Sequence, residues 1–475
     1  MNAQQPPENR GDRAAPRRER RRPPARANQE HVRTRRGWFH GVGALLISLV
    51  VVVLVVLVYR WLQVPPLPQQ PEPLVERTSA GAWPDISRGR YLVRAGDCMA
   101  CHTADGGQPF AGGRAVPTPF GTIYSTNITP DPATGIGKWG FPAFYRALHR
   151  GIRRDGSRLY PAFPYTAYTR VTREDALAIY AYLGTVAPVQ QRAPANELPW
   201  PLSIRAGMAA WNALFLDAGT FRPDPDASDE WNRGAYLVEG LLHCAACHTP
   251  RNILGAEKKH EAFAGGEAEH AFAPSLRGGQ KAGLGAWSVD DVVAYLKTGS
   301  TGATTAGGPM AEVVARSTQY LSDADLHAVA TYLKNLPGEQ GQDSGSQGAG
   351  GATRDSGDVD QGVVQRGEDV YVDNCQGCHM SGGAGQRDVF PQLKGSSAVV
   401  AAKPDTLILL LLQGGQAPAT DSRPTGMQMP PFDRKLSDRQ MADVLTYIRN
   451  AWGNQASAVS ASEVARKRRV VSRAP

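Results

Sequence analysis

Cysteine is scarce in this sequence, which has six in 475 residues. All six lie in three stretches of the form Cys-x-x-Cys-His, at 98–102, 244–248 and 375–379. No cysteine is left for a disulfide framework or a lone reactive thiol. A thioredoxin-like redox pair does not need the histidine that follows each second cysteine, and a Cys₄ zinc site would leave the third pair without a role.

Two further absences narrow the class of protein. No predicted strand is followed by a G-x-G-x-x-G turn, so the sequence offers no nicotinamide or flavin fingerprint. The net charge is +8, but the excess of lysine and arginine lies at the two ends of the chain rather than in its body. A nucleic-acid partner is therefore not expected.

The repeated motif favours covalently attached haem c. Two thiols three residues apart form thioethers with the vinyl groups of one haem, and the histidine that follows ligates the iron from the proximal side. We therefore predict three haem c groups. The predicted attachment residues are Cys98, Cys101, Cys244, Cys247, Cys375 and Cys378, and the predicted proximal ligands are His102, His248 and His379.

The second axial ligand of an electron-transfer haem is commonly methionine. Met310 lies 62 residues after His248, and Met429 lies 50 residues after His379, each shortly before a predicted helix. Met427 competes with Met429, but the two prolines that follow Met429 favour an extended loop there. We predict Met310 and Met429 as the second ligands of the second and third haems.

The first motif has no such methionine. Phe163 lies 61 residues after the histidine of that motif, and no methionine occurs between Met99, inside the attachment loop, and Met208. Met208 and His149 are candidate ligands, although core packing for Met208 and a surface or capping role for His149 are the simpler interpretations. The first haem thus has either an unexpected ligand or an open position, and we expect its spectrum and potential to differ from the others.

The N-terminal region predicts a membrane anchor. Residues 1–36 carry eleven arginines and four acidic residues, which is typical of a disordered basic tail in the cytoplasm. Residues 37–59 contain no Lys, Arg, Asp or Glu and are long enough to span a bilayer. Because Tyr59 and Trp61 suit an interfacial position, we predict an uncleaved signal anchor over 37–61, with a buried core helix as the alternative.

The arginines before this segment determine its orientation. By the positive-inside rule, they keep the N-terminus in the cytoplasm, so the body is exported to the periplasm. This location agrees with haem c, and it predicts a single-pass protein of the bacterial inner membrane. Anionic lipid headgroups are the expected neighbours of the N-terminal arginines.

The body repeats itself around the three motifs. An Arg-Gly pair precedes each motif, and a Thr or Ser that can cap a helix follows it at 172, 322 and 437. We therefore expect a mainly α fold of three tandem domains behind a single N-terminal transmembrane helix. The expected domains are 83–200, 228–337 and 363–453, with a flexible linker over 338–362 and a disordered basic tail over 454–475.

Several stretches of the body match a known family. They include TPFGTIYSTNITPD at 118–131, GIG at 135–137, RDG at 154–156, YPA at 160–162 and PTGMQMP at 424–430. With them, residues 83–453 resemble the three-haem cytochrome c subunits of membrane-bound periplasmic dehydrogenases that oxidise alcohols, gluconate, fructose or aldehydes. The resemblance implies class I cytochrome c-like domains.

The resemblance also implies a function. Such a protein is an electron-transfer subunit rather than an enzyme, and it carries electrons from a dehydrogenase catalytic subunit to ubiquinone or a terminal oxidase. Two features depart from the family: Phe163 stands where methionine is common, and the predicted anchor is N-terminal rather than a C-terminal amphipathic segment.

An enzyme of the peroxidase type is the alternative function. An open first haem could bind peroxide while another haem supplies electrons, and peroxide turnover with a reduced cytochrome as donor would distinguish the two. A purely structural tether is a third class, but it would leave three redox cofactors without a role.

Overall fold

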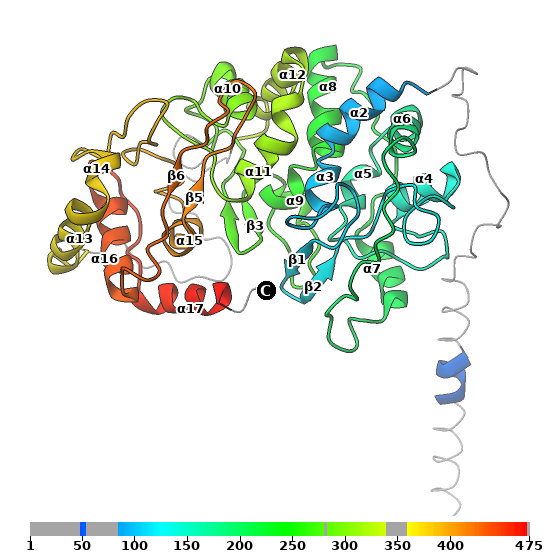
Figure 1. Ribbon diagram of the computed structural model, residues 1–475, viewed down its shortest axis with the longest axis horizontal. Helices are drawn as coiled ribbons and strands as arrows, with labels where there is room; N and C mark the ends of the chain where they lie inside the picture. The colour runs from blue at the N-terminus through cyan, green and yellow to red at the C-terminus, as the bar shows by residue number, and fades with distance from the viewer. Residues whose placement is uncertain (1–47, 54–83, 280–282, 339–358, 473–475) are drawn as a thin grey trace, which may run out of the picture. The chain divides into compact units, whose positions relative to one another are not determined.

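A computed structural model describes residues 48–53, 84–279, 283–338 and 359–472. The chain divides into two units, Met1–Val64 and Pro65–Pro475. Within the second unit, three repeats of a helical arrangement follow one another along the chain (Figure 1). The predicted mainly α class is therefore confirmed, and the sheets among the described residues are short two-stranded hairpins.

The predicted membrane anchor lies mostly outside the described residues. Of residues 37–61, only 48–53 are described, and these are helical with exposed side chains. In the described part of the chain, no helix is both long enough and apolar enough to cross a membrane. The predicted tail at 1–36 and most of the predicted linker at 338–362 also lie outside the described residues.

The first repeat contains five helices and two strands, of which the last helix is the closing helix. In chain order, these elements are α2 (Ile86–Ala95), α3 (Cys98–Cys101), β1 (Ala115–Thr118), β2 (Gly121–Tyr124), α4 (Phe141–Arg150), α5 (Tyr165–Tyr168) and α6 (Arg173–Leu183). A connecting segment then contains η1 (Arg205–Gly207) and α7 (Met208–Phe215).

The second repeat follows the same order, whereas in the third the hairpin comes after the helix that precedes the closing helix. The second contains α8 (Asp229–Tyr236), the π-helical η2 (Leu237–Leu241), α9 (Ala245–His248), η3 (Lys259–Glu261), β3 (Gly266–Ala268), β4 (Ala271–Ala273), α10 (Val289–Thr298), α11 (Pro309–Arg316), η4 (Thr318–Tyr320) and α12 (Asp323–Lys334). The third contains α13 (Gln361–Asn374), α14 (Gln376–His379), α15 (Asp405–Gln413), β5 (Gly415–Gln416), β6 (Gln428–Met429) and α16 (Asp438–Asn450), and α17 (Ala461–Val471) follows it.

In each repeat the opening helix crosses the closing helix closely: α2 packs on α6, α8 on α12 and α13 on α16. The glycine of each Arg-Gly pair lies at the crossing. A Cβ atom at Gly89, Gly234 or Gly367 would lie only 2.0–2.2 Å from a carbonyl oxygen of the closing helix. Only glycine permits this approach of two backbones, which explains why the pair occurs three times.

The predicted caps of the closing helices are confirmed. The hydroxyl groups of Thr172, Ser322 and Ser437 each accept a hydrogen bond from the backbone N–H of the third helical residue. Each cap satisfies one of the N–H groups that a helix leaves without a partner at its start. These caps fix where the closing helices begin.

Two large apolar cores and two smaller apolar clusters stabilise the described part of the second unit. The larger core is continuous across the first and second repeats, since it joins side chains such as Leu92 and Leu177 to Leu237 and Leu326. The third repeat has its own core, which includes Tyr371 and Met441. The first two repeats are thus fused by packing, while the third is packed mainly around itself.

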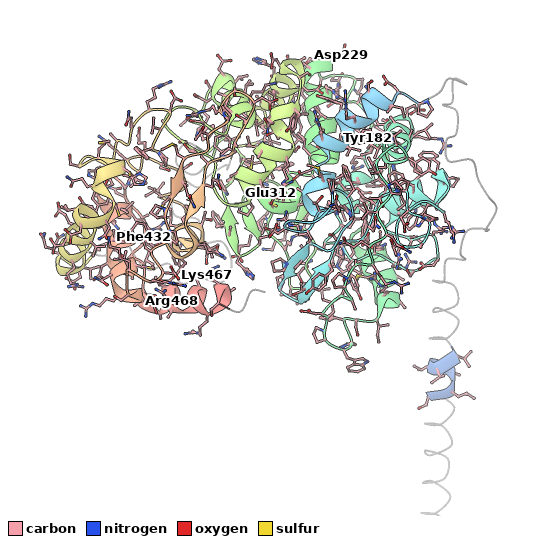
Figure 2. The ribbon with its side chains drawn as sticks, in the orientation of Figure 1. Tyr182, Asp229, Glu312, Phe432, Lys467 and Arg468 are labelled. Atoms are coloured by element: carbon pink, nitrogen blue, oxygen red, sulfur yellow. The ribbon has the colours of Figure 1, made fainter. Side chains whose placement is uncertain are left out.

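The prediction of a disordered tail over 454–475 is wrong for residues 461–471. These residues form α17, where Ser460 and Glu463 make a reciprocal capping box and Val464 is completely buried. Arg468, labelled with Lys467 in Figure 2, donates to Asp438 of α16 at 2.7 Å. A basic composition suggested disorder, but the capped turn and the buried valine give this segment enough contacts to fold.

Candidate functional site

The three Cys-x-x-Cys-His motifs occupy equivalent places in the three repeats. Each lies on a short helix directly after the opening segment: α3 after α2, α9 after α8 and η2, and α14 after α13. In the first and third repeats the opening helix contacts the motif helix. The packing of opening on closing helix therefore determines where each motif lies.

The chain enters the third motif differently from the first two. Asp97 and His243, the residues directly before the first cysteine, have left-handed φ values of 51° and 40°. In the third repeat the α13 helix continues to Asn374, and Cys375 has a φ of −120°. The first two motifs thus share a strained turn that the third does not need.

The imidazole of each motif histidine has the same hydrogen-bond partner type. Nδ1 lies 2.6 Å from the Thr126 carbonyl oxygen in the first repeat, 2.7 Å from that of Pro274 in the second and 2.9 Å from that of Pro391 in the third. A carbonyl can only accept, so Nδ1–H donates and Nε2 keeps its lone pair. This tautomer is the one in which Nε2 can ligate a metal.

A glycine closes the loop behind each histidine. The N–H groups of Gly112, Gly265 and Gly385 donate to the carbonyl oxygen of the motif histidine at 2.8, 2.9 and 3.1 Å. All three glycines have positive φ, at 76°, 91° and 60°. This conformation disfavours other residues, and it turns the chain back over the histidine so that the carbonyl acceptors can reach Nδ1.

The electrostatic surroundings fit haem attachment better than the alternatives. Burial lowers the pKa of all three motif histidines, which favours the neutral form that ligates iron. Burial raises the pKa of Cys98, Cys101 and Cys244 to about 12 and that of Cys247 and Cys375 to about 11. Redox-active thiols have a lowered pKa instead, so a thioredoxin-like role is not favoured.

A shared metal site is also not favoured. Among the described residues, which include all six cysteines, no three His, Cys, Asp or Glu side chains come together in a group that could hold a metal ion. All six thiols are free of disulfides. The motifs are therefore separate sites, as one haem per motif requires.

The predicted second ligands Met310 and Met429 both contact apolar cores. Met310, on α11, packs against the core shared by the first two repeats, and Met429, on β6, packs against the core of the third. The competitor Met427 is 41% exposed. This placement favours Met429 over Met427, and ligation itself remains a prediction.

Phe163 belongs to an aromatic group near the first motif. Its ring centroid lies 5.4 Å from that of Tyr168 and 6.4 Å from that of Tyr165. Tyr168 in turn donates to the Gly96 carbonyl oxygen at 2.8 Å, two residues before Cys98. Met208 packs in the apolar cluster that also includes Phe163, as expected for a core residue.

His149 occupies a structural position. It lies two residues before Gly151, the C-cap of α4, and Lys297 lies two residues before Gly299, the C-cap of α10. Lys297 donates to the Leu321 carbonyl oxygen at 2.9 Å, and His149 hydrogen-bonds the backbone of Val171. Because Val171 and Leu321 both directly precede the cap of a closing helix, the two side chains have the same supporting role.

Comparison with known proteins places the chain in a family. The family model described as cytochrome c matches residues 86–187, 232–337 and 364–452. The chain belongs to the cytochrome c family. Each matched segment contains one Cys-x-x-Cys-His motif, all or most of the opening helix, and the closing helix, so the family match and the structural repeats coincide.

Individual relatives support the predicted resemblance. The cytochrome c subunit of the alcohol dehydrogenase (quinone) of Gluconobacter oxydans is 44% identical over 399 residues, which cover 81% of this chain and 82% of that protein. The gluconate 2-dehydrogenase cytochrome c subunit of Pantoea cypripedii is 42% identical over 403 residues, covering 81% and 89%. The predicted resemblance to dehydrogenase cytochrome subunits is confirmed.

A third relative is a larger protein. A nicotinate dehydrogenase subunit of Pseudomonas putida is 46% identical over 376 residues, which cover 78% of this chain but only 31% of that protein. The chain therefore corresponds to one part of that larger polypeptide.

Sequence reasoning missed the residues that orient the histidines. Thr126 lies inside the stretch at 118–131 that carried the family resemblance, so a signal for it was present. Pro274 and Pro391 act through backbone carbonyls, which every residue has. Only the folded chain shows which carbonyl lies next to each imidazole.

Proposed function

We propose that this protein is a membrane-anchored periplasmic cytochrome with three haem c groups, and that it carries electrons from a dehydrogenase catalytic subunit to ubiquinone or a terminal oxidase. The observation that carries the proposal is the threefold repetition of one site, in which two cysteines precede a histidine whose Nδ1 is occupied and whose Nε2 is free. Homology to dehydrogenase cytochrome subunits supports a dehydrogenase catalytic subunit as the electron donor.

The haem groups would supply reversible one-electron exchange at iron. The chain supplies their attachment and orientation. Hydrogen bonds from Nδ1 to the carbonyls of Thr126, Pro274 and Pro391 hold each imidazole in one tautomer and one rotational position. Because desolvation lowers the pKa of each of these half-buried histidines, its imidazole stays neutral at physiological pH.

The proposal includes two methionine ligands and one exception. Met310 and Met429 would complete the coordination of the second and third haems. At Phe163 the first repeat has an aromatic ring where the family commonly has methionine. His149 hydrogen-bonds the backbone of Val171, while its Nε2 atom is buried without a hydrogen-bond partner. The first haem would therefore differ in potential, which is useful where electrons enter or leave a chain of haems.

The localisation is part of the proposal. The arginine-rich N-terminus and the apolar segment at 37–61 support a single-pass protein of the bacterial inner membrane, with its haem domains in the periplasm. Membrane lipid would then be a partner of the N-terminal region, and a catalytic subunit would be a partner of the periplasmic body.

One preparation tests the function. The full chain, produced with haem-attachment machinery and with a dehydrogenase catalytic subunit encoded beside it in its genome, should contain three haems by mass and haemochrome spectrum. It should become reduced when the dehydrogenase substrate is added. If the protein contains no covalent haem, or if the dehydrogenase reduces an acceptor equally fast without it, the proposed function is wrong.

Ligand binding at the first haem distinguishes the electron-transfer function from the peroxidase alternative. We expect the reduced wild-type protein to bind carbon monoxide at one haem at most, and Phe163→Met to abolish that binding, because a thioether sulfur would occupy the open position. Met310→Phe is the matched control, and it should create a CO-binding haem in the second repeat. Peroxide turnover in the wild type that is lost in Phe163→Met would instead favour the peroxidase alternative.

A further inference from the structure

In the closing helices of the first two repeats, an aspartate in the first turn accepts hydrogen bonds from two side chains. Asp175, the third residue of α6, accepts at Oδ1 from Arg88 Nε at 2.6 Å. Asp325, the third residue of α12, accepts from Arg233 through two bonds of 2.8 Å. In both cases the arginine belongs to the Arg-Gly pair of the same repeat, so these arginine-to-aspartate contacts lie within one repeat.

The second contact of each aspartate is with a tyrosine of the other repeat. Tyr91 of the first repeat donates its hydroxyl proton to Asp325 of the second at 2.5 Å. Tyr236 of the second repeat donates to Asp175 of the first at 2.6 Å. Each tyrosine lies three residues after the arginine of its own repeat, so the two contacts are related by a local two-fold symmetry.

Each tyrosine also replaces part of a helix cap. The backbone N–H of Thr172 donates to the Tyr236 hydroxyl oxygen at 3.3 Å, and that of Ser322 donates to the Tyr91 hydroxyl oxygen at 3.3 Å. In a capping box, the side chain of the third helical residue accepts this N–H. Here that residue is the aspartate held by arginine, and the tyrosine of the other repeat satisfies the N–H instead.

The third repeat shows the same cap without a neighbour. Gln440 Oε1 accepts from the Ser437 N–H at 3.0 Å, which completes an ordinary capping box. Arg366 pairs with Asp443, one turn further along the helix, at 2.9 Å. Asp369 occupies the position that tyrosine has in the other two repeats. The third repeat therefore lacks both the tyrosine and the aspartate that make the contact between the first two repeats.

The contacts lie on the interface that brings the first two motifs together. Tyr168 donates to the Gly96 carbonyl oxygen at 2.8 Å before the first motif, and its ring packs edge-on against that of His243, the residue before Cys244, with centroids 5.5 Å apart. The Ser317 hydroxyl donates to the Ala95 carbonyl oxygen at 2.9 Å. Glu312 of α11, labelled in Figure 2, accepts from Arg114 at 2.6 Å. Any rotation at this interface would move one motif relative to the other.

We propose that Tyr91 and Tyr236 are positioning residues that hold the first and second haem sites at one separation, so that these two repeats work as a single two-haem electron-transfer module. This inference rests on the proposed function. A hydroxyl-to-carboxylate bond is short and directional, and two such bonds related by symmetry restrict rotation about the interface. The third haem belongs outside this module, since its repeat has neither group.

The double variant Tyr91→Phe with Tyr236→Phe tests the proposal in the full haem-loaded chain. Phenylalanine keeps both rings in the core and removes only the hydroxyl groups. Pulsed electron paramagnetic resonance on the ferric protein would measure the separation of the first and second haems. We expect the population outside the native separation to rise about tenfold, and flash-induced electron equilibration between these haems to slow, while separations to the third haem keep their widths.

Tyr332→Phe is the matched control. It removes a hydroxyl group that donates to a carboxylate, Glu239, at 2.6 Å, but both residues lie inside the second repeat. The control should leave the haem separation unchanged. An unchanged distribution in the double variant, or equal broadening in the control, would overturn the inference. The distance measurement needs no dehydrogenase, so a failure of the proposed function appears separately, as missing haem or missing reduction by the partner.

Discussion

The first two repeats and the third are built on one plan but are held in the molecule by different forces. All three cross an opening helix over a closing helix at glycine and cap the closing helix with a hydroxyl group. The first two then share one apolar core and two reciprocal tyrosine-to-aspartate contacts. The third has a core of its own, so equal local folds do not imply equal coupling.

The third repeat meets the second through polar contacts rather than through a shared core. The Asp388 N–H donates to the Gly302 carbonyl oxygen at 3.0 Å, and the Gln392 N–H donates to that of Ala303 at 2.9 Å. Lys403 pairs with Glu267, and the side chains of these residues are 56% and 58% exposed. The Thr406 hydroxyl donates to the Phe272 carbonyl oxygen at 3.0 Å, and Lys467 of α17 donates to the His270 carbonyl oxygen at 2.9 Å. The exposed pair of Lys403 with Glu267 depends on salt far more than a buried core does.

The largest expected difference comes from removing a haem attachment site. Replacing Cys244 and Cys247 with alanine should remove one haem and destabilise both the first and second repeats, because their core is continuous. Replacing Cys375 and Cys378 should remove one haem and destabilise only the third. Haem content and limited proteolysis would measure these losses. If the Cys244 and Cys247 variant were cleaved only in the second repeat, the prediction would be contradicted.

A smaller effect should follow from breaking the caps. Asp325→Ala leaves Arg233 and Tyr91 without their shared acceptor, and we expect a loss of about 3 kcal/mol in unfolding free energy, since breaking a largely buried charge pair costs this much. Gln440→Ala removes only half of a capping box and should cost about 1 kcal/mol. Chemical denaturation of the two variants would give the difference, and equal losses would show that the contact across the repeats contributes nothing.

Acid should weaken the Tyr91-to-Asp325 contact between the first two repeats only at low pH. Burial alone would raise the pKa of Asp325, but hydrogen bonds from Arg233 and Tyr91 outweigh it and lower the pKa below its usual value. The stabilisation is therefore complete above the unfolded pKa of about 3.9 and is lost as pH falls through the lower folded value. Haem separations should stay constant from neutral pH to about pH 5, and a change within that range would contradict this assignment.

The smallest expected effect is that of salt on the third repeat. Raising the ionic strength to about 1 M reduces the Debye length to about 3 Å, which weakens exposed pairs such as Lys403 with Glu267 by a few tenths of a kcal/mol. We expect the separation between the second and third haems to broaden slightly while that between the first and second stays unchanged. Equal broadening of both would remove the distinction between the two interfaces.

Much of the site followed from residue types and spacing. The three motifs, the caps at Thr172, Ser322 and Ser437 and the resemblance to dehydrogenase cytochrome subunits were all accessible without a structure. The Ser460-to-Glu463 capping box was also present in the sequence, but the basic composition of the tail hid it. Residue spacing could not show that His149 in the first repeat and Lys297 in the second support their closing helices in the same way, since the two side chains differ in chemistry and belong to no shared motif.

The sequence alone determined the chemistry of this protein, because haem attachment needs a thiol, a second thiol and an imidazole at a spacing that local chain geometry imposes. It also determined the three helix crossings, since glycine at 89, 234 and 367 is a local requirement of a close approach. Tertiary structure alone decided which repeats are coupled. Tyr91 and Asp325 are 234 positions apart, and only folding brings a donor and an acceptor at that distance in sequence into one hydrogen bond.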